Sequence, residues 1–327
     1  MISFLLCACS SSKSFVYFEA LQPADVSYPS DIRKVGYLNR SPLSIHSLTP
    51  SNRKNLDATG LSIIDTIVCN NLKEGFLEGR KSKEISYLDS IVFLEERRYD
   101  TIGRENPLDG YELWRIFNEN KLDALISMEY YSLELNKSFT YYNYELLDYV
   151  EEFSFFMEIV WRVYTPNSSM PIDTFRTSDT LYFLNQSSRE GEYLSATDVL
   201  EKGSGILGYE YGRRHVPYWT EVARVVFRGG SKELREAASY TDEGKWEKAA
   251  ELWKQTLEYP DDESVAKAYH NLSVYYEIED DIPMAYEMAV AAATRWDNTF
   301  IQNHKKAMET RLKSRERLFR QLDISVN

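Results

Sequence analysis

Apolar residues near the end of the chain recur with the spacing of two packed helices, and the pattern occurs twice. Within EAASYTDEGKWEKAAELWKQTLEYPDD (236–262), Gly244 marks a turn and Pro260 ends the second helix. Small residues at Ala237 and Ala249 allow two helices to approach closely. A second copy covers 266–293. The pattern predicts two successive helical hairpins.

These hairpins resemble tetratricopeptide repeats, because Tyr240 and Tyr276 occupy equivalent places 36 residues apart and the repeat period is about 34 residues. We assign the two repeats to residues 231–298. One further amphipathic helix is predicted at 299–323, with basic residues mainly off its apolar stripe. We expect this helix to cap the repeats, the alternative being an anion- or membrane-binding helix.

Between residues 30 and 228 the pattern alternates between strand and helix periods, which predicts a mixed α/β domain. The predicted strands are 31–41, 92–94, 123–135, 154–166 and 170–184, and the predicted helices are 61–76, 111–120 and 196–218. The segment 228–230 would join this domain to the repeats. The expected fold class is α+β: an N-terminal, sandwich-like sheet with packed helices, followed by an all-α repeat module.

Composition supports two folded domains with an acidic surface. The 327 residues are 43% hydrophobic, and 51 acidic against 38 basic residues give a net charge of -13. This balance disfavours nucleic acid as a partner, because binding phosphates needs a basic face. No apolar run reaches the roughly 20 residues of a membrane-spanning helix.

The N-terminal stretch Leu6-Cys7-Ala8-Cys9 resembles a bacterial lipobox, and Ser10–Ser12 follow it. We therefore expect residues 1–9 to be the remnant of a signal, Cys9 to carry a lipid, and residues 10–29 to form a tether. Since no Lys or Arg precedes Cys9, we expect the natural start upstream of Met1. The alternative is a buried first strand with two core cysteines. On the lipoprotein interpretation Cys7 leaves with the signal and Cys9 is acylated, so only Cys69 remains as a thiol and no structural disulfide is possible.

Three segments together resemble an uncharacterised family of Bacteroidota lipoproteins with C-terminal tetratricopeptide repeats. They are NKLDALISMEYYSLE, EIVWRVYTP and GYEYGRRHVPYWTEVARVVFRGG. The resemblance implies a cell-envelope protein with a membrane anchor, and the lack of acidic residues just after Cys9 favours the periplasmic face of the outer membrane. At fold level alone, the domain is also similar to small envelope domains such as the amino-terminal domain of TolB and the curli-export lipoproteins.

Motifs for catalysis or cofactor binding are weak. Gly203, Gly205 and Gly208 match G-x-G-x-x-G, but the preceding sequence predicts a helix, so close helix packing is the favoured interpretation. The four histidines show no metal-ligand spacing, and Cys69 lies on an apolar helical stretch. We expect no enzyme activity, no cofactor and no metal.

Two groups of residues are candidates for binding. Arg213, Arg214, Trp219 and Arg224 could hold an anion or glycan, or form an ion-paired seam against the repeats. Lys267, His270 and Asn271 lie on the face that clamps a peptide carboxylate in peptide-binding repeats, although the first repeat lacks the pattern. That face could instead pack on the α/β domain.

The expected function is that of an adaptor or assembly factor, in which the repeat module binds an envelope protein. The alternative is a lipoprotein that binds a ligand or glycan through the arginine and aromatic residues.

Overall fold

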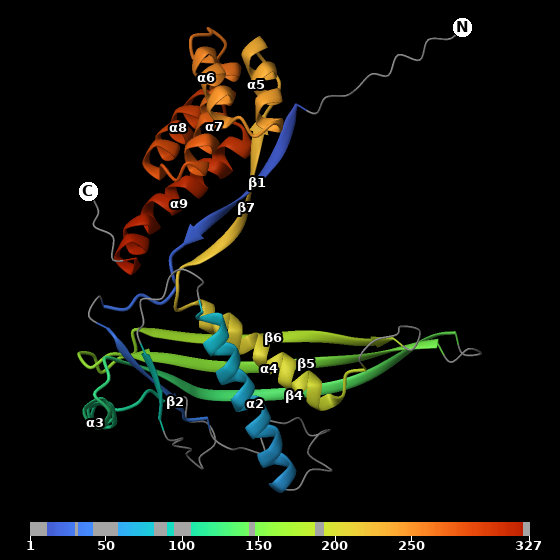
Figure 1. Ribbon diagram of the computed structural model, residues 1–327, viewed down its shortest axis with the longest axis vertical. Helices are drawn as coiled ribbons and strands as arrows, with labels where there is room; N and C mark the ends of the chain where they lie inside the picture. The colour runs from blue at the N-terminus through green and yellow to red at the C-terminus, as the bar shows by residue number, and fades with distance from the viewer. Residues whose placement is uncertain are drawn as a thin grey trace. The chain divides into compact units, whose positions relative to one another are not determined.

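The computed structural model describes residues 12–29, 32–41, 58–81, 90–94, 106–143, 148–186 and 193–322. They divide into two compact units (Figure 1). The sheet unit is Ala24–Pro217, and the ribbon unit combines Met1–Pro23 with Tyr218–Asn327. The first carries a mixed sheet with helices and the second ends in a series of helices, so the predicted α+β class is confirmed.

The sheet unit is inserted between the two strands of a β-ribbon. β1 (Lys13–Gln22) pairs antiparallel with β7 (Tyr218–Phe227), from Lys13 opposite Phe227 to Gln22 opposite Tyr218. The ends of the inserted unit lie together as well, because the Val26 N–H donates to the Arg214 carbonyl at 2.9 Å. A unit whose ends are adjacent can interrupt a ribbon without separating its strands.

The ribbon corrects two predictions about local structure. Within the predicted tether 10–29, residues 13–22 form β1. The predicted helix 196–218 ends at Arg213, and residues 218–227 form β7, which belongs to the ribbon unit. Both errors have one cause: the two strands are separated by the whole inserted unit, and local pattern does not reveal such distant pairing.

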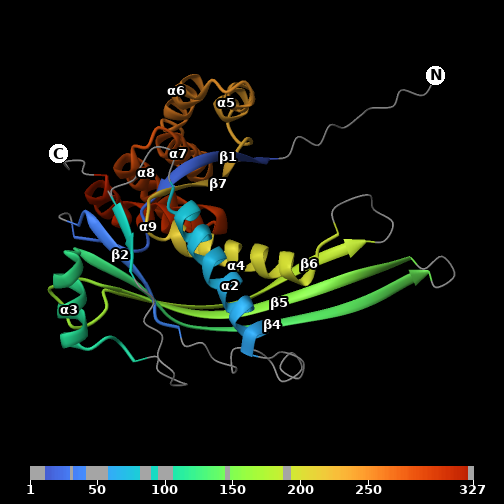
Figure 2. The ribbon, with the colours of Figure 1, turned by 60° about the horizontal axis from the view of Figure 1, so that its bottom comes forward.

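The sheet unit is built on five strands in the order β3-β2-β4-β5-β6. Their bounds are β2 Lys34–Asn39, β3 Ser90–Phe93, β4 Ala124–Asn143, β5 Asp148–Tyr164 and β6 Asp173–Gln186. β2 is parallel to both β3 and β4, whereas β4, β5 and β6 are antiparallel. All five predicted strands are present, and Figure 2 shows β4, β5 and β6 as the long strands of the sheet.

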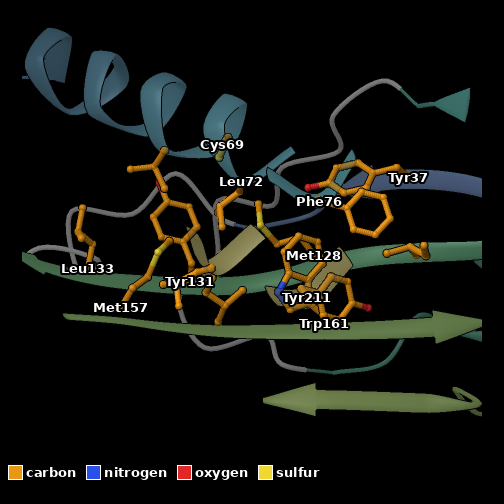
Figure 3. Packing of buried hydrophobic residues seen from close by; sticks show 14 of the residues in the cluster. Tyr37, Cys69, Leu72, Phe76, Met128, Tyr131, Leu133, Met157, Trp161 and Tyr211 are labelled. Carbon is orange, nitrogen blue, oxygen red and sulfur yellow. The ribbon is translucent and has the colours of Figure 1, made fainter. Parts of the chain in front are cut away.

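Helices α2 (Ala58–Gly79) and α4 (Ala196–Arg213) cover one face of this sheet side by side (Figure 2). Figure 3 shows the core beneath them, where the Tyr211 ring stacks on Trp161 with centroids 4.3 Å apart. A side chain at Gly208 would collide with the Leu72 carbonyl oxygen of α2. The glycine motif therefore permits close helix packing, as predicted, while α4 continues through it unbroken.

Helix α3 (Gly110–Asn120) packs on the opposite face of the sheet. Asp109 caps its first turn by accepting from the Glu112 N–H, and Lys121 ends it in the left-handed conformation at φ 51°. Its apolar side chains join a second core with Leu38 and Leu125. The β2 end of the sheet is thus covered on both faces.

The helices of the ribbon unit are α5 (Lys232–Asp242), α6 (Trp246–Thr256), α7 (Asp262–Ile278), α8 (Ile282–Arg295) and α9 (Thr299–Gln321). The first four form the two predicted hairpins, with turns at Gly244 (φ 72°) and Asp280 (φ 57°). α9 confirms the helix predicted at 299–323 and buries Ile301 and Met308. Across the described parts of the chain, no helix combines the length and apolar character needed to span a membrane.

Candidate functional site

The three polar residues predicted to clamp a peptide on α7 do not form a free groove. Lys267 is paired with Glu263 at 2.6 Å, and its ammonium group lies 5.4 Å from the centre of the Trp296 ring. His270 and Asn271 are buried against β7, a strand of the same unit. The chain's own strand β7 therefore occupies this face, which agrees with the packing alternative and leaves these three side chains engaged within the unit.

Asn271 acts toward β7 as a neighbouring strand would. Its Oδ1 accepts from the Phe227 N–H and its Nδ2 donates to the Phe227 carbonyl, both at 2.8 Å. His270 Nε2 donates to the Val225 carbonyl at 2.8 Å. The last residues of β7 thus have hydrogen-bond partners on the edge away from β1, which satisfies buried backbone groups.

The four residues of the predicted arginine and aromatic site are divided between the units. Arg213 and Arg214 belong to the sheet unit, whereas Trp219 and Arg224 belong to the ribbon unit. Neither unit by itself contains the predicted cluster. The charges of three members are engaged in ion pairs within their own units, and the pair of Arg224 with Glu277 of α7 agrees with the alternative of an ion-paired seam against the repeats.

In the sheet unit, Arg214 pairs with Asp25 at 2.9 Å and with Asp173 at 3.5 Å, and its guanidinium group lies 3.9 Å from the Phe175 ring centre. Arg213 pairs with Glu210 at 3.7 Å. Desolvation of Asp173 raises the pKa of its carboxyl group and the Arg214 charge opposes that rise. Arg214 therefore holds the two ends of the sheet unit together.

In the ribbon unit, Arg224 makes two hydrogen bonds to the buried carboxylate of Glu277, at 2.6 and 2.7 Å. The same carboxylate accepts from Arg311 of α9 at 2.9 Å. Such charge-assisted, bidentate bonds are strong and directional. Glu277 therefore joins β7, α7 and α9, and Arg224 has a structural role.

A surface that the sequence did not indicate lies on one side of the ribbon. We call this side the ribbon face and define it as Phe15, Tyr17, Glu19, Trp219 and Glu221. Residues directly opposite each other in an antiparallel pair point to the same side, and so do alternate residues along one strand. Tyr17 lies opposite Ala223, Glu19 opposite Glu221 and Leu21 opposite Trp219, so all five side chains lie on one side of the ribbon. Along SFVYFEAL (14–21) and YWTEVARVVF (218–227) apolar residues fall on both sides of the strand, so the sequence pattern did not distinguish the exposed side.

The aromatic side chains of the ribbon face are open to solvent. Phe15 is 59% exposed, Tyr17 64% and Trp219 50%. The other side of the same strands carries Val16 and Phe18, which pack on the helices. The ribbon is thus supported from behind and presents its aromatic residues outward.

Two carboxylates face each other in the middle of the ribbon face. Glu19 and Glu221 are direct cross-strand partners, and both are exposed. Like charges in this position repel each other. A cation brought between them would relieve the repulsion, so the face is complementary to a basic group flanked by apolar ones.

The carboxyl ends of the parallel strands offer a second place for chemistry, since ligands of α/β sheets bind there. A cavity of about 200 Å³ is lined by Tyr37, Asn39, Cys69, Asn70, Lys73, Phe93 and Leu94. The Cys69 thiol accepts from Asn39 Nδ2 at 3.3 Å and donates to Asp65 at 3.7 Å. These two contacts hold the sulfur between α2 and β2.

A buried ionic group lies near the same end of the sheet. The Glu129 carboxylate pairs with Arg40 and accepts from the Tyr164 hydroxyl at 2.9 Å. Desolvation raises the pKa of Glu129, whereas the Arg40 charge lowers it. These bonds join β4 to β5 and to the residue that follows β2.

Among the residues that the structure describes, no group of three or more His, Cys, Asp or Glu side chains is arranged to hold a metal ion. Cys9, the predicted lipid attachment site, lies outside the described residues.

Comparisons with known proteins identify a family but no activity. No curated protein matches the chain. Among solved structures, the chain is similar to the PelC dodecamer from Paraburkholderia phytofirmans, at 9% identity over 62% of this chain and 97% of that chain, with a TM-score of 0.24. That score is too low to show a shared fold. Residues 235–315 match the model of a domain of unknown function, DUF6340. Residues 32–227, more than half of the chain, match the model of another domain of unknown function, and the chain belongs to that family, DUF8603.

Proposed function

We propose that the protein is a non-catalytic cell-envelope lipoprotein that acts as an adaptor, binding a protein partner on the ribbon face. The observation that carries the proposal is the exposed aromatic and acidic surface of a ribbon that helices support from behind. Aromatic residues are enriched at protein interfaces because they bury much area at small entropic cost. The surface is built on paired strands and is open to solvent, which suits a protein partner.

The repulsion between Glu19 and Glu221 specifies the partner's chemistry. The bound segment carries a Lys or Arg that reaches both carboxylates, with apolar side chains on either side that cover Tyr17 and Trp219. A membrane surface is a poorer occupant, because anionic lipids repel two adjacent carboxylates. The helical repeats have a supporting role in this proposal: α7 holds β7, and β7 carries half of the ribbon face.

Lipid attachment at Cys9 would place this face close to a membrane. β1 begins at Lys13, four residues after Cys9. An extended chain covers at most about 3.6 Å per residue, so the ribbon would begin within about 14 Å of the lipidated residue. The partner is therefore expected to be an envelope protein with a basic segment near the membrane, on the periplasmic side of the outer membrane.

The proposal can be tested by cross-linking in cells, followed by purification of the captured protein and a binding measurement. We expect Trp219→Ala to weaken binding of the purified partner by about 30-fold, the effect of losing an interface hot spot. Glu221→Lys should abolish the salt dependence of binding, because it removes the acidic pair. The matched control is Trp114→Ala, which removes an exposed tryptophan from the sheet unit.

Three outcomes would contradict the proposal. Equal binding by Trp219→Ala and the wild-type protein would remove the ribbon face as the site. Flotation of the unlipidated protein with lipid vesicles, abolished by Trp219→Ala, would assign the face to a membrane. If a Cys9→Ser variant stays in the membrane fraction, Cys9 is not the membrane anchor. The ribbon face is then tested by the binding measurement with Trp219→Ala alone.

A further inference from the structure

A cavity in the sheet unit lies between the end of α3 and the turn that joins β5 to β6. It measures about 690 Å³, large enough for a small ligand or one segment of a polymer. Polar and apolar side chains line it in similar numbers. They are Leu113, Trp114, Phe117, Asn118, Lys121, Leu122, Asp123, Pro166, Asn167, Ser168 and Ser169, with Gly110.

Hydrogen bonds hold both walls of the cavity in place. On the turn, the Ser168 hydroxyl donates to the Met170 carbonyl at 2.8 Å, and the Ile172 N–H donates to the Val163 carbonyl at 2.7 Å. On the other wall, Asp123 accepts from the Lys34 N–H at 2.8 Å. A preformed site of this kind loses little entropy when a ligand binds.

Exposed aromatic rings stand at the edge of the cavity. Trp114 lines it and is 62% exposed, and Tyr111, one helical turn earlier, is 70% exposed. Their rings are stacked, with centroids 6.2 Å apart and an angle of 23° between the planes. The core beneath α3 is formed by other side chains, including Leu113 and Phe117. These two rings therefore contribute little to packing and offer a flat apolar surface to a ligand.

The polar lining retains hydrogen-bonding capacity. Asn118 Nδ2 donates to the Trp114 carbonyl at 2.7 Å, which orients the amide and leaves its oxygen as an acceptor. The Asn167 side chain makes no hydrogen bond to other residues that the structure describes and offers both donors and acceptors. Acidic and basic character are both present, in Asp123 and Lys121, so the cavity does not select for charge of one sign.

We propose that this cavity binds a saccharide chain. The two faces of a pyranose ring are apolar C–H surfaces, which pack on an aromatic plane such as Trp114. The edge of the pyranose ring carries adjacent hydroxyl groups, each of which both donates and accepts hydrogen bonds. These hydroxyl groups match amide and carboxylate side chains such as Asn118, Asn167 and Asp123. A polyanion fits less well, because Asp123 would repel it and the lining contains no arginine.

The saccharide site differs from the predicted glycan site at Arg213 and Arg214 and is independent of the ribbon face. It lies wholly within the sheet unit, whereas the ribbon face lies wholly within the ribbon unit. An adaptor with both sites would link a protein partner to a glycan.

The test is a titration of the full chain with defined hexasaccharides: β-1,4-glucan, β-1,4-linked N-acetylglucosamine, β-1,3-glucan and α-1,4-glucan. Tryptophan fluorescence and calorimetry report binding. We expect at least one hexasaccharide to bind and to alter the emission of Trp114. Trp114→Ala should weaken that binding at least tenfold, and Asn167→Ala by about fivefold. Trp219→Ala, an exposed tryptophan in the other unit, should leave it unchanged.

The proposal is overturned if none of the hexasaccharides binds the wild-type chain at concentrations up to about 10 mM. It is also overturned if Trp114→Ala and Trp219→Ala bind the saccharide equally well. Binding of a random peptide mixture at Trp114, without any saccharide binding, would reassign the cavity to a peptide. Circular dichroism of each variant separates loss of binding from loss of the fold. Because Trp114 is exposed, we expect its replacement to leave the fold intact.

Discussion

Asn271 is a residue whose chemical type was recognised from the sequence and whose role was not. Polar side chains on the first helix of a repeat suggested a clamp for a peptide carboxylate. The structure shows instead that Asn271 bonds to the backbone of Phe227, 44 residues earlier in the same chain. Sequence spacing reveals the capacity for hydrogen bonding. It does not reveal which strand uses that capacity, because the choice depends on distant pairing.

We predict that Asn271→Ala destabilises the ribbon unit by about 2–4 kcal/mol. The substitution leaves the Phe227 N–H and carbonyl buried without these partners, and each unsatisfied group costs about 1–3 kcal/mol. Urea denaturation measures the free energy of unfolding, and amide exchange at Phe227 localises the effect. Asn303→Ala, on the exposed side of α9, is the control and should change stability by less than about 0.5 kcal/mol. Equal effects of the two substitutions would refute the role given to Asn271.

At the scale of elements, the contact between α2 and α4 depends on which glycines face it. A side chain at Gly208 would collide with the backbone of α2, whereas one at Gly205 would meet nothing within 4 Å. The sequence showed the glycine motif, and close helix packing was predicted from it. The partner helix could not be predicted, since the motif itself carries no information about α2.

We predict opposite effects for two substitutions in one helix. Gly208→Ala should destabilise the sheet unit by about 1–3 kcal/mol, because the added methyl group forces the helices apart. Gly205→Ala should stabilise it by about 0.5–1 kcal/mol, because alanine has the higher helix propensity and the position is open. Thermal denaturation of both variants measures the difference. The same sign for both would mean that the helices do not approach as described.

At the scale of the whole molecule, stability is expected to fall in mild acid because buried histidines stay neutral. Burial lowers the pKa of His215 to about 3 and that of His270 to about 4, and it also lowers the pKa of His304. Each folded pKa is below the unfolded value of about 6.5, so the unfolded chain binds protons first as the pH falls. The stabilising contribution of each histidine is complete above about pH 6.5 and is lost as the pH falls toward its folded pKa, which is about 4 for His270 and about 3 for His215.

We therefore predict that the free energy of unfolding falls by about 2 kcal/mol per buried histidine between pH 7 and pH 5. The ribbon unit contains two of these histidines and the sheet unit one. His215→Phe removes one titrating group and should make the loss for the sheet unit smaller, whatever its effect at pH 7. Denaturant titrations at both pH values measure this change. An unchanged pH dependence in His215→Phe would disprove the assignment.

The outline of the molecule was predictable, but its connectivity was not. Strands β2 to β6 and the helical hairpins follow from local periodicity, which the sequence displays directly. β1 and β7 were missed as a pair because their pairing spans the inserted unit. The same omission concealed the ribbon face, whose residues come from both strands. The Arg213–Arg224 stretch was grouped because it is continuous in sequence, although the boundary between the units divides it.

The register of the ribbon has a mechanical consequence for a chain anchored at Cys9. Lys13 and Phe227 lie at the same end of the antiparallel pair, so tension between the anchor and the helices would peel the strands apart one residue pair at a time. Tension between the anchor and the sheet unit would pass along the covalent backbone of β1 and leave its hydrogen bonds unstrained. Which unit holds a partner would therefore decide how much pulling force the protein withstands before its ribbon opens.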